Sequence, residues 1–218
     1  MSRFAAIIFD MDGVLIDSEP LHFEVLNEVL ARDGQTLSRK DNEEFIGTTS
    51  QAMWTTLIAR RGLPGTLTEY KALYDQTLLR ELLQSRDPAP GAVGLIQRAR
   101  EVGMRLGVAS SSRQIWIDAT LTSLGLSDAF DAVVSGDDVE RGKPDPQIYL
   151  LAAHRLGIIP DRCLAIEDSP NGVVSARRAG MTVLGVRTSY TAHLHLEGAE
   201  RIVDSLGELN LIEDELSL

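Results

Sequence analysis

Side chains able to take part in chemistry stand at the ends of several apolar, strand-like runs. Asp10 and Asp12 close the first run, and residues two apart on an extended chain point to the same side. Three further clusters follow later runs, namely Ser110 to Ser112, Lys143 and Glu167-Asp168. Taken singly, each cluster also fits a turn, a helix cap or a solvated loop, because such residues are common there.

Taken together, these groups indicate a site for phosphoryl chemistry. Carboxylates gathered at one place repel one another unless a cation lies between them, and oxygen ligands select Mg²⁺ or Ca²⁺. A few carboxylates with room for water and a phosphate oxygen favour Mg²⁺. Lys143 adds a positive charge, and the serines with the next helix N-terminus form an anion cradle. Phosphoryl transfer needs a nucleophile, neutralised phosphoryl oxygens and a proton for the leaving alkoxide, which Asp10, the metal with Lys143, and Asp12 can supply in turn.

The pattern of elements predicts how these groups meet. Apolar runs alternate with helical periodicity after residue 91, which is typical of an α/β fold with a doubly wound, Rossmann-like parallel sheet. Ligands of such sheets bind outside the carboxyl ends of the strands, where all four clusters fall. We expect strands at residues 4–9, 105–109, 132–135, 163–166 and 182–186, with a short last one near 202–203.

An all-helical insertion is predicted directly after the first strand. Glu19-Pro20 can open a helix, later apolar residues recur at helical spacing, and Pro88 to Gly91 marks the return to the core. We therefore expect an α/β core of residues 1–16 and 88–218 and a small helical domain of residues 17–87, of four-helix-bundle type.

Composition narrows the classes of partner. The chain has 218 residues with 21 basic and 32 acidic side chains, a net charge of −11 that disfavours nucleic acid and anionic membranes. The single cysteine, Cys163, lies in an apolar run and is expected to be a buried thiol. We find neither a signal-peptide pattern nor an apolar run of membrane-spanning length, and we expect a cytoplasmic monomer that acts on a small molecule.

In the order and spacing of its motifs, the chain resembles the haloacid dehalogenase superfamily, and within it the β-phosphoglucomutase-like phosphatases. The resemblance spans essentially the whole chain. The residues that carry it are Phe9-Asp10-Met11-Asp12-Gly13-Val14, Val108-Ala109-Ser110-Ser111, Gly142-Lys143-Pro144-Asp145-Pro146 and Ile166-Glu167-Asp168-Ser169-Pro170-Asn171-Gly172.

The resemblance implies a role for each of these positions. Asp10 would become an aspartyl phosphate, and Asp12 would protonate the leaving group and then activate water. Ser110, Ser111 and Lys143 would hold the phosphoryl group. Mg²⁺ would be bound by the Asp10 carboxylate, the Asp12 backbone carbonyl and Asp168, with Glu167 as a further or outer ligand. The helical insertion would be the small cap that covers the site.

Cap residues bear on the choice between phosphatase and phosphomutase. Sugar phosphomutases of this group carry a cap arginine after a Gly-x-x stretch, and aligning that stretch with Gly47-Thr48-Thr49 puts Ser50 in its place. Ser112, Arg113 and Gln114 still form a polar, basic run where mutases carry the core half of their second phosphate site, so the phosphomutase stays an alternative. His22 aligns with a cap-hinge histidine but equally fits an exposed position in a first helical turn. Trp54 could pack in the cap or stack on a sugar.

Three functions are therefore compared. The first is Mg²⁺-dependent hydrolysis of small phosphorylated metabolites, sugar phosphates above all. The alternative is a hexose phosphomutase of the same fold. A third possibility, from another class, is a phospho-acceptor regulatory module, against which the helical insertion and the second aspartate argue, since a receiver needs neither lid nor leaving-group acid.

Overall fold

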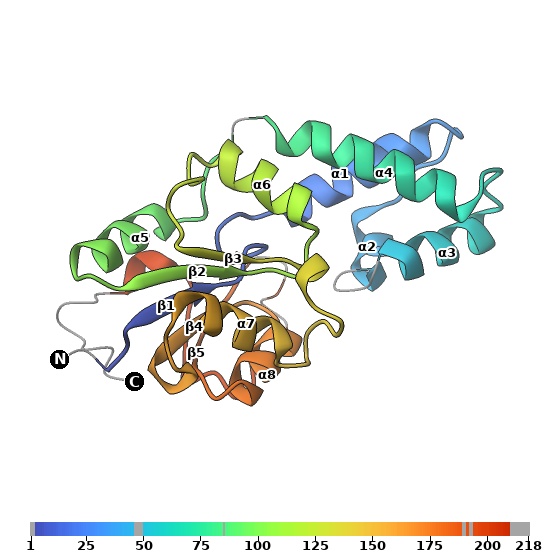
Figure 1. Ribbon diagram of the computed structural model, residues 1–218. Helices are drawn as coiled ribbons and strands as arrows, with labels where there is room; N and C mark the ends of the chain where they lie inside the picture. Colours follow the sequence, from blue (N-terminus) through green and yellow to red (C-terminus); the bar gives the residue numbers. More distant parts are fainter. Residues whose placement is uncertain (1–2, 46–49, 85, 189–190, 192–193, 210–218) are drawn as a thin grey trace. The chain divides into compact units, whose positions relative to one another are not determined.

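The computed structural model describes residues 3–45, 50–84, 86–188, 191 and 194–209. The chain divides into two compact units, Met1–Asp17 together with Ser85–Leu218, and Ser18–Gln84 (Figure 1). No helix within the described residues is long and apolar enough to cross a membrane.

A parallel sheet forms the centre of the larger unit. Its six strands, counted over the described residues, lie in the order β3-β2-β1-β4-β5-β6, and every neighbouring pair is parallel. The strands are β1 (Ala6–Phe9), β2 (Arg105–Ala109), β3 (Ala132–Val134), β4 (Cys163–Glu167), β5 (Thr182–Val186) and β6 (Arg201–Val203). The predicted α/β fold with a parallel, Rossmann-like sheet is thereby confirmed. The first strand begins two residues later than expected, at Ala6.

Helices cover both faces of this sheet and bury it (Figure 1). Ile7 and Phe9 belong to one apolar cluster and Ile8 to the other, as the alternation of a strand requires. The first cluster also holds apolar residues of α5 (Ala92–Glu101) and α6 (Gln114–Ser123), and the second those of α7 (Gln147–Leu156) and α8 (Pro170–Arg178). Short 3₁₀ segments complete the unit, η2 (Gly136–Asp138), η3 (Pro160–Arg162) and η4 (Leu206–Glu208).

The strand register sets which polar residues meet at the carboxyl edge. Phe9, the last residue of β1, pairs with Val108 of β2 and with Ile166 of β4. The N–H of Asp10 continues the ladder by donating to the carbonyl oxygen of Ile166 at 2.9 Å. Asp10 therefore leaves the sheet beside Glu167, which is the last residue of β4.

The smaller unit is helical in its described residues. It contains α1 (Glu19–Ala31), α2 (Arg39–Asn42), η1 (Glu43–Phe45), α3 (Ser50–Arg61) and α4 (Leu67–Leu82). The helix α4 packs against both α1 and α3. Its start follows from the sequence, because Thr66 and Glu69 form a reciprocal capping box.

Candidate active site

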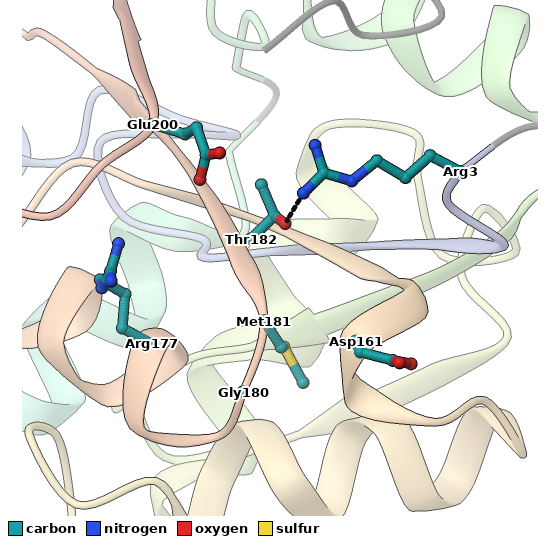
Figure 2. A pocket seen from close by; sticks show the side chains of 7 residues that line it. All are labelled: Arg3, Asp161, Arg177, Gly180, Met181, Thr182 and Glu200. Atoms are coloured by element: carbon teal, nitrogen blue, oxygen red, sulfur yellow. Dashed lines mark hydrogen bonds between the residues drawn. The ribbon is translucent and has the colours of Figure 1, made fainter.

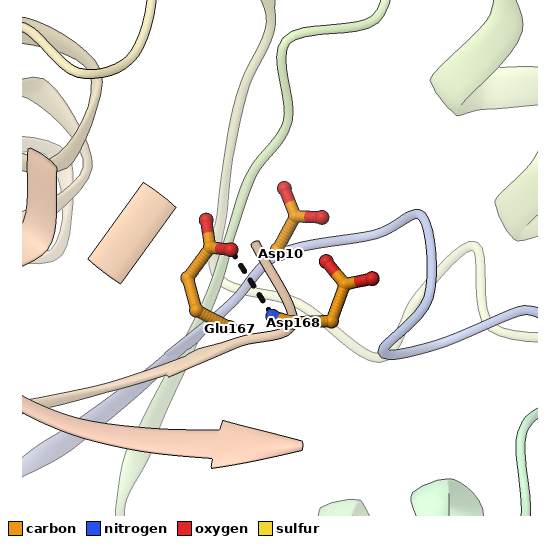
Figure 3. Close-up of side chains that lie close together, drawn as sticks. All are labelled: Asp10, Glu167 and Asp168. Atoms are coloured by element: carbon orange, nitrogen blue, oxygen red, sulfur yellow. Dashed lines mark hydrogen bonds between the residues drawn. The ribbon is translucent and has the colours of Figure 1, made fainter. Parts of the chain in front are cut away.

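Three carboxylates from two neighbouring strands converge at the carboxyl edge of the sheet. Asp10 follows β1, Glu167 ends β4, and Asp168 is the next residue (Figure 3). One carboxylate oxygen of each lies within 4.8 Å of the others. All three residues are buried, so their mutual repulsion is poorly screened by water.

Lys143 supplies a positive charge to this cluster. It reaches the strand ends from the loop before α7, and its side chain is only 7% exposed. Its Nζ donates to Asp10 Oδ1 at 2.5 Å and to Glu167 Oε1 at 2.6 Å. Burial disfavours the ammonium form, but the charges of Asp10 and Glu167 outweigh it and raise the pKa of Lys143 above its ordinary value. Lys143 is therefore held as a fixed cation against the Asp10 carboxylate.

Glu167 is saturated with hydrogen bonds. Besides Lys143, its Oε1 accepts from the Tyr149 hydroxyl at 2.7 Å. Its Oε2 accepts from the N–H of Asp168 at 3.1 Å, the N–H of Ser169 at 3.2 Å and the Ser169 hydroxyl at 3.0 Å. With both oxygens engaged and the residue fully buried, Glu167 holds Lys143 and the loop after β4 in place.

The Asp10 and Asp168 carboxylates have the composition of a hard-cation site. Burial raises the pKa of Asp10 to about 7, although the charge of Lys143 opposes the shift. Burial also raises the pKa of Asp168 to about 9, and the charges of Asp10 and Glu167 add to the effect. The single positive charge of Lys143 does not neutralise the three carboxylates of the cluster. Their oxygen atoms are ligands of the kind that Mg²⁺ prefers.

Gly13 makes room for this arrangement. Its φ of +79° lies in the left-handed region, and a Cβ built at this position would stand 2.1 Å from Oδ2 of Asp168. The turn after Asp12 therefore requires glycine both for its backbone conformation and for the close approach of the Asp168 carboxylate.

Asp12 is held by a serine that follows β2. The Ser112 hydroxyl donates to Oδ2 of Asp12 at 3.0 Å, and the Ser112 N–H donates to the Ser110 hydroxyl at 3.1 Å. Ser110 is fully buried, whereas Ser111 is exposed. The structure thus brings Asp10, Asp12, Ser110 and Lys143 to one edge of the sheet, with the backbone of Ser111 in the same loop.

The two predicted substrate residues beside α6 have partners of their own. Arg113 precedes the helix, is exposed, and has its guanidinium 5.9 Å from the Trp116 ring centre. Gln114 opens the helix, its N–H donates to Asp137 Oδ2 at 2.9 Å, and its amide nitrogen donates to Asp118 Oδ1 at 2.7 Å.

The residues proposed from the helical insertion lie in the smaller unit. The His22 ring is neither fully exposed nor alone, because its Nδ1 lies 2.6 Å from the Tyr74 hydroxyl and the two rings stack. Ser50 is the first residue of α3, and its buried hydroxyl has no hydrogen-bond partner among the described residues. The stretch Gly47-Thr48-Thr49, on which the mutase comparison depends, lies outside the described residues.

Trp54 packs in the interior of the smaller unit. It is 0% exposed, its ring stacks on Tyr70 at 5.1 Å between centres, and Tyr74 meets it edge-on at 6.0 Å. The hypothesis that Trp54 stacks on a sugar is therefore wrong, because no face of the ring is accessible. The surface positions expected for His154 and His195 are confirmed, while His193 lies outside the described residues.

Two residues of the site escaped sequence reasoning in these roles. Tyr149 lies on the buried face of α7, and nothing in an apolar helical pattern signals that its hydroxyl reaches Glu167. Ser112 belongs to a serine run that suggested an anion cradle, and only the structure shows that its hydroxyl turns to Asp12.

A separate hollow of about 340 Å³ opens at the opposite, amino edge of the strands (Figure 2). Its charged side chains are Arg3, Asp161, Arg177 and Glu200, two basic and two acidic. Arg3 donates to the Thr182 hydroxyl at 3.3 Å. Because these charges balance, the hollow lacks the electrostatic character that would select a phosphate ester, and the carboxyl edge remains the candidate site.

Taken together, the parallel sheet and the acidic edge with its single lysine define a phosphoryl-processing α/β enzyme. The family described as haloacid dehalogenase-like hydrolase matches residues 7–186. The phosphorylated carbohydrates phosphatase of Thermotoga maritima is 32% identical over 176 residues, which cover 81% of this chain and 82% of that protein. Hexitol phosphatase B of Escherichia coli is 33% identical over 183 residues, with 82% of each chain covered.

Solved structures agree with these relatives. The crystal structure of CbbY from Rhodobacter sphaeroides in complex with phosphate has a TM-score of 0.85 at 29% identity and covers 95% of this chain and 96% of that chain. A mutant of the same protein was solved in complex with xylulose-(1,5)-bisphosphate. The chain belongs to the haloacid dehalogenase-like hydrolase family, within its phosphoglucomutase-like members, and it is a phosphoric monoester hydrolase. The resemblance found in the motifs is thus confirmed.

Proposed function

We propose that the enzyme hydrolyses small phosphorylated carbohydrates in a Mg²⁺-dependent reaction through an aspartyl phosphate on Asp10. The observation that carries this proposal is the position of Asp10, whose carboxylate accepts a hydrogen bond from the Lys143 ammonium group and has an oxygen within 4.8 Å of one of Asp168. A nucleophile held there can attack phosphorus while positive charge neutralises the phosphoryl oxygens.

Each residue then has a defined role in the reaction. Asp10 attacks phosphorus, and Asp12 gives its proton to the leaving oxygen. Once Asp12 has given up its proton, its carboxylate is a base. It can therefore remove a proton from the water that hydrolyses the acyl phosphate. Lys143 binds a phosphoryl oxygen, helped by the Ser110 hydroxyl and the Ser111 backbone N–H. The close contact between Lys143 and Asp10 supports these assignments.

The Asp10 and Asp168 carboxylates would hold Mg²⁺, with the backbone carbonyl of Asp12 as a further ligand. When bound, the ion supplies positive charge to the phosphoryl oxygens. We assign Glu167 to the outer shell, because its five hydrogen bonds already engage both oxygens. The excess negative charge of the carboxylate cluster supports the binding of Mg²⁺ at this position.

We further propose that the enzyme is a monomer with a catalytic core of residues 1–16 and 88–218 and a cap of residues 17–87, of four-helix-bundle type. His22 and Ser50 from the cap, and Arg113 and Gln114 from the core, would contact the substrate. The buried hydroxyl of Ser50 supports such a contact, because it has no partner within the described part of the chain and a buried polar atom without a partner is costly.

The relatives support a carbohydrate substrate. Two of them are named for phosphorylated carbohydrates and for hexitol phosphates, and the CbbY structure binds a pentulose bisphosphate. We therefore expect sugar and sugar-alcohol phosphates to be better substrates than nucleotides.

The first prediction tests this function with a panel of phosphate esters. Asp10→Asn should lower phosphate release at least about a thousandfold, since the amide is a poor nucleophile. Chelation of divalent ions should abolish release, and added Mg²⁺ should restore it. Asp128→Asn, which removes an exposed carboxylate, is the matched control and should keep full activity.

Unchanged turnover by Asp10→Asn, or full turnover in chelator, would contradict the proposal. The same assay should follow hexose 1-phosphates together with a hexose bisphosphate. Accumulation of hexose 6-phosphate faster than free phosphate would instead establish the phosphomutase.

A further inference from the structure

Asp12 follows the first strand, forms an isolated bridge with Ile16 and directly precedes the turn at residues 13–15, so its side chain stands outside the sheet. The residue is half-buried, and its Oδ2 accepts a hydrogen bond from the Ser112 hydroxyl at 3.0 Å. The two residues belong to different loops at the carboxyl edge, one after β1 and the other after β2. This contact joins the loop of the proposed acid to the loop of the proposed phosphate cradle.

Ser112 is itself firmly held. Its N–H donates to the buried Ser110 hydroxyl at 3.1 Å, and its carbonyl oxygen accepts from the N–H of Gly136 at 2.9 Å. A Cβ at Gly136 would lie 2.4 Å from the carbonyl oxygen of Ser111, so the loop is packed closely against η2. These contacts hold the backbone of Ser112 in place, and from this fixed backbone its hydroxyl donates to Asp12.

We infer that Ser112 is a positioning residue that orients the Asp12 carboxyl group for proton transfer. The inference rests on the proposed function. In the first step a bond forms between Asp10 and phosphorus, the bond from phosphorus to the substrate oxygen breaks, and that oxygen takes the proton of Asp12. In the second step water attacks phosphorus, Asp12 takes the water proton, and the bond to Asp10 breaks. Ser112 exchanges no proton in either step.

This role has a chemical signature that a structural role lacks. The leaving oxygen of a sugar phosphate or of glycerol phosphate is a strongly basic alkoxide and needs the proton. The p-nitrophenolate ion is a weak base and leaves without one. Loss of the Ser112 hydroxyl should therefore slow the transfer of the phosphoryl group from alkyl esters much more than from p-nitrophenyl phosphate.

The second prediction compares kcat/KM for glycerol phosphate and p-nitrophenyl phosphate, because this constant reports the first step. We expect Ser112→Ala to lower kcat/KM about tenfold for the alkyl ester and less than about twofold for the aryl ester. Ser112→Cys, which keeps the volume but donates weakly, should behave like alanine. Ser112→Thr keeps the hydroxyl and should restore most of the alkyl-ester activity.

Ser127→Ala, at an exposed serine, is the matched control and should leave both esters unchanged. Equal losses for the two esters, or a rise in KM alone, would overturn the inference and assign Ser112 to phosphate binding or to folding. No change for either ester would overturn it as well. Asp12→Asn provides the benchmark, with a stronger selective loss for the alkyl ester. If Asp12→Asn shows no such selectivity, the acid role in the proposed function fails, and the inference falls with it.

Discussion

At the scale of single residues, Glu167 links the parts of the site that come from different segments. Its Oε1 accepts from Lys143 and from Tyr149, and the Lys143 ammonium lies 5.1 Å from the centre of the Tyr149 ring. Burial raises the pKa of the Tyr149 phenol well above its ordinary value, and the charge of Glu167 adds to this, so the phenol acts only as a donor. Lys143 is thereby fixed by hydrogen bonds to two carboxylates and by the face of the Tyr149 ring.

The third prediction concerns Tyr149→Phe. The ring stays beside Lys143, but a charged acceptor loses a buried donor, which should cost about 2 kcal/mol of stability. Because Glu167 then holds Lys143 less firmly, kcat should fall by up to about tenfold. Thermal unfolding and steady-state kinetics measure the two effects.

Tyr70→Phe is a suitable control, since it removes a similar hydrogen bond, from the Tyr70 hydroxyl to Asp33 Oδ2 at 2.7 Å, within the helical unit. It should lower the melting temperature and leave kcat unchanged. A normal kcat in Tyr149→Phe would show that Lys143 is held sufficiently by its carboxylates.

Sequence reasoning located the polar groups at strand ends because a strand's end fixes where its next residue lies. It brought Asp10, Lys143 and Asp168 to one edge without any knowledge of side-chain contacts. It could not decide whether Glu167 binds Mg²⁺ directly or lies in its outer shell. That choice depends on the hydrogen bond that Tyr149 of α7 donates to Glu167. It could not decide whether Trp54 packs inside the helical unit or stacks on a sugar. The side to which a helical residue points depends on the elements that pack against the helix.

At the scale of elements, the start of α8 is built into the site. Ser169 caps this helix by accepting from the N–H of Gly172 at 3.1 Å, while its own hydroxyl donates to Glu167. A Cβ at Gly172 would lie 1.8 Å from Glu167 Oε1. The first turn of the helix therefore contains a glycine, which lowers its helix propensity. The missing side chain makes room for the buried Glu167 carboxylate.

The fourth prediction separates these two effects with Gly172→Ala. Helix propensity alone favours alanine by about 1 kcal/mol, yet the added methyl group must displace the Glu167 carboxylate from its donors. We expect a net loss of at least about 2 kcal/mol and a strong fall in kcat. Gly94→Ala in α5 is the control, because its Cβ would meet only the end of the Arg98 side chain at 3.1 Å. An equal or higher melting temperature for Gly172→Ala would contradict the argument.

The elements themselves were largely predictable, because hydrophobic period distinguishes the buried strands of the core from its helices. The short last strand at Arg201–Val203 was expected from two apolar residues alone. The single turn α2 was not foreseen, since Arg39–Asn42 contains no apolar residue that could show a period. Its formation depends on the surrounding chain and not on its own sequence.

At the scale of the whole molecule, the chain passes between its two units at Asp17–Ser18 and at Gln84–Ser85. The proposed cap must move relative to the core in order to admit and then cover a substrate, so we expect the motion to occur where the chain crosses between the two units. The lone Cys163 is useful for a test, because it is buried and burial raises its thiol pKa to about 11, which keeps it unreactive towards labels.

The fifth prediction uses spin labels at two exposed positions, Gln76→Cys in α4 and Ser127→Cys in the core. Their distance distribution should shift or narrow when Mg²⁺ and a phosphate mimic such as vanadate are added. A pair within the core, Ser127→Cys with Glu101→Cys, should show no change. Identical distributions for the first pair with and without the mimic would speak against a moving cap.

The position of β1 in the middle of the sheet also has a consequence for biosynthesis. β1 is synthesised before its partners β2 and β4, which begin only at Arg105 and Cys163. The helical unit Ser18–Gln84 is contiguous and lies between them in the chain, so it can fold while β1 is still unpaired. The proposed nucleophile Asp10 is thus made well before β4, the strand that completes its site.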